Sequence, residues 1–151
     1  MTENPRLLVL SDLKADEYVS TLITRANEHL KAIGYTEHGH RHAGLVSNIS
    51  RNILRRLDCP ERDCELAAMA AYLHDIGNVV SRDHHWLVGA NMALVYLRDL
   101  GMDADEALTI ANAIGIGALF SLVSLSLKIM SFPPSRTAIS ASLRNASSLS
   151  F

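Results

Sequence analysis

The 151-residue chain contains little cysteine, and its two cysteines do not form a recognisable pair. Cys59 and Cys64 lie five residues apart around Pro60, a spacing that fits neither a CxxC redox motif nor a zinc knuckle. Nothing else in the sequence indicates an oxidising compartment, so we interpret both residues as reduced thiols. The cysteines therefore predict neither a disulfide scaffold nor a thiolate-bound metal.

The chain also lacks a strong charge of either sign. Its formal net charge is -2 at pH 7 and its pI is near 6.4, and runs of like charge stay below about four residues. We therefore expect no surface for a nucleic-acid polymer. The N-terminus begins with Thr2, Glu3, Asn4 and Pro5 rather than with basic residues and an apolar core, so we expect no secretory signal and a cytoplasmic location.

Acidic residues are absent from the last part of the chain. No Asp or Glu follows Glu106, and 107–127 holds no charged residue at all, which makes a window long enough to span a bilayer. Thr109, Asn112 and several glycines and serines dilute this window, and its first half belongs to a predicted helix. A membrane-tethered module is therefore only the third-ranked interpretation. We interpret 116–151, where serines are scattered without a period, as an atypical and loosely ordered tail.

Apolar residues elsewhere follow the helical period. Between about 16 and 33 they recur every three or four positions, and Gly34 ends the run. Further helices are predicted to start near His42, Pro60, His84 and Asp103. No role is predicted for 1–12, and no convincing alternating strand pattern precedes the tail. The sequence predicts an all-α fold, a compact bundle of about five to six helices.

Two of these helices carry stripes that we expect to face the core. The stripe of the second helix comprises His42, Val46, Ile49 and Ile53. The stripe of the fourth helix comprises Val88, Met92, Val95 and Tyr96. Asp83 is the expected cap of that fourth helix. If the first stripe faces the core, His42 points inward.

Histidine and aspartate residues stand at the ends of the predicted helices. His74 and Asp75 follow an alanine-rich helical run and precede Gly77, so they offer one nitrogen and one oxygen to the same point. Mixed donors of this kind suit divalent manganese, iron, nickel or magnesium. His42 and His85 are expected to converge on the pair. Each histidine taken alone also fits a core residue bonded to a carbonyl, and only the set favours a metal.

The order of these residues resembles the HD superfamily of metal-dependent phosphohydrolases. The matching segments are 36–43, which contains His42, 73–78, which contains the His-Asp pair, and 82–90, in which Gly89 and Ala90 follow His85. The similarity extends to about Gly115. The resemblance implies a helical bundle with one or two divalent ions, of Mn, Fe, Ni, Co or Mg.

The resemblance also implies roles for individual residues. His42, His74 and Asp75 are the expected metal ligands, Asp75 is able to bridge two ions, and His85 serves a second ion as in the two-metal, HD-GYP-like branch. Metal-bound water then hydrolyses a phosphate ester or nucleotide, so no protein nucleophile is required. Catalytic roles fall to Asp75 and His85, and to Arg41 and Arg82 as candidates for binding phosphate.

Three more histidines, His38, His40 and His84, are candidates for further ligands or proton carriers. Adjacent side chains on a helix diverge by about 100°, so we expect only one of His84 and His85 to face the metal, and the following Gly-Ala favours His85. The expected partner is a small phosphorylated substrate or nucleotide. Exposed apolar residues in the tail favour self-association.

The sequence departs from the family pattern in two places. Asn78 stands where many relatives carry a lysine, and Ile116, Gly117 and Ala118 follow Gly115 where relatives continue with Asn-His and an acid. The late aspartate ligand of two-metal relatives is absent. We therefore divide the chain into an HD-type domain, 1–115, and the tail, 116–151, which we hypothesise to arise from a shifted reading frame. The alternative function is a truncated or decayed HD domain that binds metal or nucleotide without turnover.

Overall fold

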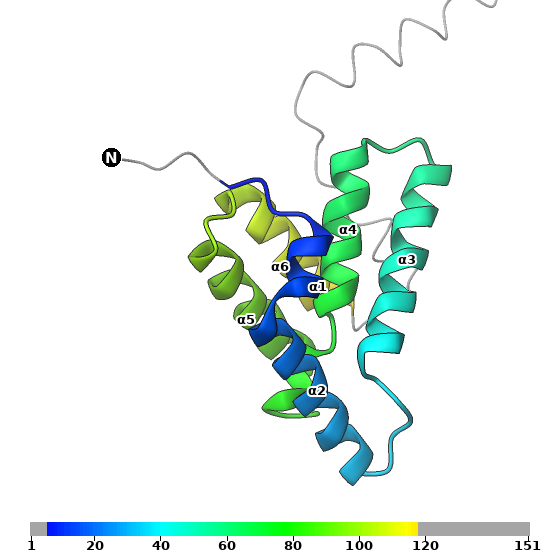
Figure 1. The fold of residues 1–151 in the computed structure, drawn as a ribbon, viewed down its shortest axis with the longest axis vertical. Helices are drawn as coiled ribbons and strands as arrows, with labels where there is room; N and C mark the ends of the chain where they lie inside the picture. Colours follow the sequence, from blue (N-terminus) through cyan, green and yellow to red (C-terminus); the bar gives the residue numbers. More distant parts are fainter. Residues whose placement is uncertain (1–5, 118–151) are drawn as a thin grey trace, which may run out of the picture.

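In the computed structural model of the chain, residues 6–117 are described, and the regular structure in this range is entirely helical. The all-α prediction and the helix count are therefore confirmed. The helices are α1 (Leu10–Ala15), α2 (Glu17–Ala32), α3 (His40–Arg56), α4 (Glu61–Leu73), α5 (His85–Asp99) and α6 (Ala104–Gly117), with a short 3-10 helix η1 (Ile76–Val79) after α4 (Figure 1). Nearly all of the predicted tail lies outside the described residues. Among the residues described, no helix combines the length and apolar character that a membrane crossing needs.

Helix α4 lies at the centre of the bundle because most of its length carries no charge and small residues alternate there with large apolar ones. Every residue from Leu66 to Leu73 is buried, and four of these are alanines, which let neighbouring helices approach closely. Helix α4 packs against α1, α3 and α6 (Figure 1). On the α3 side, the buried Ser47 hydroxyl donates a hydrogen bond of 2.8 Å to the carbonyl of Ala68. This packing fixes the end of α4, where His74 stands.

Helix η1 links the end of α4 to the start of α5 through a backbone contact. It packs against both α2 and α5. A Cβ atom at Gly77 would lie 1.9 Å from the carbonyl oxygen of His85 and 2.5 Å from the amide nitrogen of Gly89. Only glycine permits this approach, because the opposing atoms are backbone. The glycine after the His-Asp pair therefore brings His85 to that pair.

The N-terminal segment contains a helix that the sequence analysis did not predict. Helix α1 is six residues long, too short for its period to stand out, and it buries Leu10 and Leu13 against the core, with Leu8 buried just before it. The carboxylate of Asp12 accepts a hydrogen bond of 3.0 Å from the amide of Val9 and so closes the first turn. Leu8, Leu10 and Leu13 thus form part of the core.

Both predicted core stripes are displaced from the buried faces. The buried residues of α3 are Ala43, Val46, Ser47, Ser50 and Leu54, whereas Ile49 and Ile53 are half-buried. Those of α5 are Gly89, Ala93 and Leu97, whereas Val88, Met92 and Tyr96 are half-buried and Val95 is 54% exposed. Small residues face the neighbouring helices because they allow the closest packing. A stripe chosen by hydrophobicity alone therefore misses the centre of each face.

The helix caps give one confirmed and one wrong prediction. The Asp103 carboxylate accepts hydrogen bonds of 2.9 and 3.3 Å from the amides of Asp105 and Glu106, so it caps α6 as predicted. Asp83 does not cap α5, because the N-cap residue is His84, which has a φ of 58° and forms no side-chain cap. A left-handed residue at this point turns the chain sharply into α5.

Candidate metal centre

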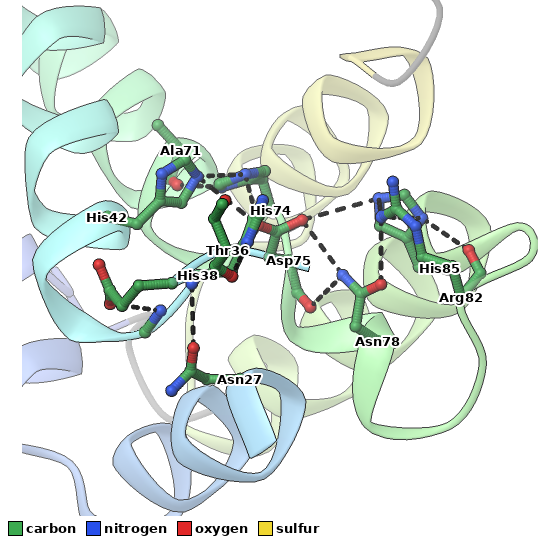
Figure 2. Close-up of polar contacts among 12 residues, drawn as sticks. Asn27, Thr36, His38, His42, Ala71, His74, Asp75, Asn78, Arg82 and His85 are labelled. Carbon is green, nitrogen blue, oxygen red and sulfur yellow. Dashed lines mark hydrogen bonds and ion pairs between the residues drawn. The ribbon is translucent and has the colours of Figure 1, made fainter. Parts of the chain in front are cut away.

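His74 and Asp75 face the same point because they form the junction between α4, which ends at Leu73, and η1, which begins at Ile76. Adjacent side chains in an α-helix diverge by about 100°. Here His74 keeps helical backbone angles, φ -57° and ψ -30°, while Asp75 moves to φ -100° and ψ -1°. As a result, Nε2 of His74 lies 3.0 Å from Oδ2 of Asp75 (Figure 2).

His42 and His38 approach this pair from the start of α3 and the loop before it. Nε2 of His42 lies 3.4 Å from Nε2 of His74 and 3.6 Å from Oδ2 of Asp75. The rings of His38 and His42 lie 4.9 Å apart, and His38, His42 and Asp75 each offer a ligand atom within 4.8 Å of the others. The structure thus brings together the predicted ligands His42, His74 and Asp75 and, of the three further candidates, His38.

Three histidines of the site are held in the same tautomer by backbone carbonyls. The acceptors are Thr36 for His38 (2.8 Å), Ala71 for His74 (2.8 Å) and Arg82 for His85 (3.0 Å), each bonded to Nδ1. A carbonyl oxygen only accepts, so Nδ1 carries a proton in each ring. Nε2 is then the atom free to bind a cation, an arrangement typical of metal-binding histidines.

The two carboxylate oxygens of Asp75 face opposite sides of the site. Oδ2 is buried, faces His42 and His74, and accepts no hydrogen bond from any described residue. Oδ1 lies 3.6 Å from Nε2 of His85 and accepts a hydrogen bond of 3.2 Å from the amide of Asn78 (Figure 2). When the facing imidazole nitrogens carry no proton, this buried oxygen has no donor, which is costly, whereas a cation between it and the imidazoles would satisfy it. The donor set therefore fits a divalent metal ion.

The pKa shifts of His74 and Asp75 favour an ion pair between them when no metal is bound, in which Nε2 of His74 carries a proton and faces Oδ2 of Asp75. Burial raises the pKa of Asp75, but the imidazole of His74 lowers it by more, to about 2. Burial lowers the pKa of His74, and the Asp75 carboxylate together with the Ala71 carbonyl raises it by more. A metal ion at Nε2 would displace the His74 proton, so metal binding should release a proton.

His42 and His85 are in the form that binds metal. Burial lowers the pKa of His42, and the neighbouring His74 lowers it further, against the opposing effect of Asp75. Burial also lowers the pKa of His85, despite the hydrogen bond to the Arg82 carbonyl. Both imidazoles are therefore neutral at pH 7.

The structure separates the two arginines that the sequence analysis proposed for binding phosphate. Nη1 of Arg82 lies 3.3 Å from Oδ1 of Asn78 and 3.5 Å from each ring nitrogen of His85. The Arg41 side chain is 86% exposed and pairs with Glu37 at 3.3 Å. Arg82 belongs to the site, whereas Arg41 extends into solvent.

Two of the remaining candidate histidines lie apart from the cluster. Nε2 of His40 lies 3.3 Å from the hydroxyls of Ser20 and Thr24, and its Nδ1 lies 3.4 Å from the hydroxyl of Tyr72. His84 is exposed at the start of α5. Of the adjacent pair, His85 is the residue that lies beside Asp75.

Sequence reasoning missed the residues that support the site from α2. Nδ1 of His29 donates a hydrogen bond of 2.6 Å to the carbonyl of Asn78, and Oδ1 of Asn27 accepts one of 2.9 Å from the amide of His38. Asn78 was noted only as a lost positive charge, yet it is fully buried and also bonds the Asp75 carbonyl at 2.9 Å. The contact between His29 and Asn78 joins residues 49 positions apart, and such a contact leaves no periodic pattern in the sequence.

Comparison with known proteins identifies the family. The HD domain family matches residues 39–115, just over half of the chain, and this range contains His42, His74, Asp75 and His85. The chain belongs to the HD domain family. HD domains are generally metal-dependent phosphohydrolases, and the family supports a metal-binding hydrolase here.

A curated relative matches a longer stretch of sequence. The chain is 32% identical over 102 residues to Uncharacterized protein MJ1020 of Methanocaldococcus jannaschii, an alignment that covers 58% of this chain and 39% of that protein. The HD chain thus spans about two fifths of the length of this relative. No solved structure matches the chain.

Proposed function

We propose that this HD domain hydrolyses a phosphate ester or nucleotide with a divalent ion held by His42, His74 and Asp75. The observation that carries the proposal is the buried Oδ2 of Asp75, which faces the Nε2 atoms of His42 and His74 and has no other donor among the described residues. Mn, Fe, Co, Ni and Mg all suit such donors. His38 is a further candidate ligand, because a ligand atom of His38 lies within 4.8 Å of those of His42 and Asp75.

The protein residues divide the remaining work of the reaction. A bound divalent ion acidifies water and neutralises charge on the phosphoryl oxygens. Asn78 holds Oδ1 of Asp75, which leaves Oδ2 directed at the histidines. The guanidinium of Arg82 is placed to donate to a phosphoryl oxygen, and neutral His85 can accept a proton at Nε2.

A metal-titrated phosphatase assay tests this proposal. The chain, stripped with a chelator, should be inactive on an aryl phosphate and should regain turnover with excess Mn²⁺. Replacing Asp75 with Asn should lower kcat/KM by about a hundredfold or more, because the developing negative charge loses its metal. His40→Ala, which removes a histidine bonded outside the cluster, should keep wild-type turnover. Turnover that survives chelation or Asp75→Asn would refute the proposal.

A second candidate is a domain that binds metal without turnover. It is favoured by one observation: Asp75 is the single carboxylate in the group of ligand atoms that the described residues form. A two-metal centre carries a charge of about +4, which one carboxylate balances poorly, so the second ion assigned to His85 should exchange readily. This candidate predicts stoichiometric Mn²⁺ with no turnover on any phosphate ester at saturating metal.

A further inference from the structure

We propose that the guanidinium of Arg82 supplies the second positive charge of this site, in place of a second metal ion, and receives a phosphoryl oxygen of the substrate. The inference rests on the proposed function, because it takes one ion at His42, His74 and Asp75 as given. It assigns the Oδ1 side of Asp75, next to His85, to the substrate rather than to a second metal ion.

The position of Arg82 excludes a second ion by charge. An ion bound to both Nε2 of His85 and Oδ1 of Asp75 would sit between two atoms that are 3.6 Å apart. Nη1 of Arg82 lies 3.5 Å from that same Nε2. A guanidinium is always protonated, and a dication a few ångströms from it is repelled strongly in a partly buried site. Oδ1 also already accepts a hydrogen bond from Asn78.

Arg82 is held in this position from two sides. Its Nη1 donates to Oδ1 of Asn78, and Asn78 is fully buried and bonded in turn to Asp75. The centre of the guanidinium lies 4.6 Å from the ring of Tyr35, a cation-π contact that supports the opposite side. The guanidinium is therefore prearranged beside His85 rather than free to leave when a metal arrives.

A cavity next to Arg82 gives an anionic substrate group access to the guanidinium. Its volume is about 290 Å³, and it is lined by Tyr35, Arg82, Asp83, His84, His85 and Trp86. Asp83 also lines this cavity, and its negative charge opposes an anion, whereas the charge of Arg82 attracts one. Tyr35 and Trp86 provide apolar surface for the group esterified to the phosphate. The cavity thus suits a phosphate ester of an aromatic or otherwise apolar alcohol.

Calorimetric titration of the metal-free chain with Mn²⁺, followed by titration with inorganic phosphate, tests the inference. Wild type should bind one Mn²⁺ per chain. Arg82→Gln, which keeps a donor for Asn78 but removes the charge, should admit a second Mn²⁺ and should weaken phosphate binding to the one-metal form by about tenfold or more. Arg82→Lys, which keeps the charge, should bind one Mn²⁺ and recover part of the phosphate affinity.

The control is Arg98→Gln, which removes the same charge from the exposed end of α5 and should match wild type in both titrations. Circular dichroism of each variant checks that the helices remain. Two Mn²⁺ ions in wild type, or an Arg82→Gln variant that matches wild type, would overturn this inference and leave the proposed function standing. Absence of any Mn²⁺ in wild type would overturn both.

Discussion

Replacing Gly77 with alanine should separate the two sides of the candidate metal centre. The new Cβ would lie 1.9 Å from the carbonyl oxygen of His85 and 2.5 Å from the amide nitrogen of Gly89. Both atoms are backbone of α5, so no side chain can swing aside to make room. The distance to His85 must grow to about 3.4 Å before the contact is ordinary, which requires α5 to move away from η1.

This displacement should lower the stability of the fold and move His85 away from Asp75. Overpacking of a well-packed interior typically costs about 1–3 kcal/mol. In a domain of roughly this size each 1 kcal/mol lowers Tm by about 4–8 °C, so we expect thermal unfolding to occur on the order of 5–20 °C earlier. His85 is the first residue of α5 and moves with it, so the 3.6 Å approach of its Nε2 to Oδ1 of Asp75 should be lost as well.

A second glycine provides a matched control for this substitution. A Cβ at Gly44, inside α3, would meet nothing within 4 Å, so Gly44→Ala should stabilise the chain by about 0.5–1 kcal/mol through helix propensity alone. Thermal unfolding followed by far-UV circular dichroism measures both variants. The reasoning fails if Gly77→Ala unfolds at or above the wild-type temperature, because η1 and α5 would then not be in backbone contact.

Three further substitutions test the packing that supports the site. Asp103→Ala removes the cap of α6 and should lower the free energy of unfolding by about 1 kcal/mol in urea titrations; an unchanged midpoint would argue against the cap. Arg62→Gln breaks the two hydrogen bonds to Glu106 and should lower the free energy of unfolding by about 1–3 kcal/mol. The double variant with Glu106→Gln should be destabilised by the same amount as Arg62→Gln alone. Additive losses from the two substitutions would contradict the pairing. Burial and the hydrogen bond to Asp16 raise the pKa of Tyr96 to about 12, so the stabilisation from this contact is present below pH 10 and is lost as the pH rises through 12. In ultraviolet titrations Asp16→Asn should lower the pKa of Tyr96, and an unchanged titration curve would exclude the contact.

The histidines and the aspartate of the centre could be found from sequence because order and position carry the signal. His74 and Asp75 stand where an alanine-rich helix gives way to Gly77, and His42 and His85 stand near the starts of the helices before and after it. The structure places the three histidines around the carboxylate of Asp75, with His42 and His74 at Oδ2 and His85 at Oδ1. That they bind metal is still a prediction.

The supporting residues could not be found in this way, because they act through contacts between distant segments. His29 and Asn27 reach the site from α2, which no helical period reveals. Arg41 is adjacent to His42 in sequence and Arg82 is three residues from His85, yet only Arg82 points into the site. The predicted core stripes were displaced for a related reason. Small residues such as Ser47 face the neighbouring helix most closely, and a search for apolar residues passes over a serine.

Metal retention by the His74→Ala variant tests the central claim most directly. Wild type and variant are loaded with Mn²⁺, dialysed, and analysed for metal per chain, with His40→Ala as a histidine control outside the cluster. Wild type and the control should retain stoichiometric metal. His74→Ala should remain helical by circular dichroism and retain far less than one ion, because it loses the imidazole that lies 3.0 Å from Oδ2 of Asp75. Full retention of Mn²⁺ by a folded His74→Ala variant would contradict the assignment of this centre.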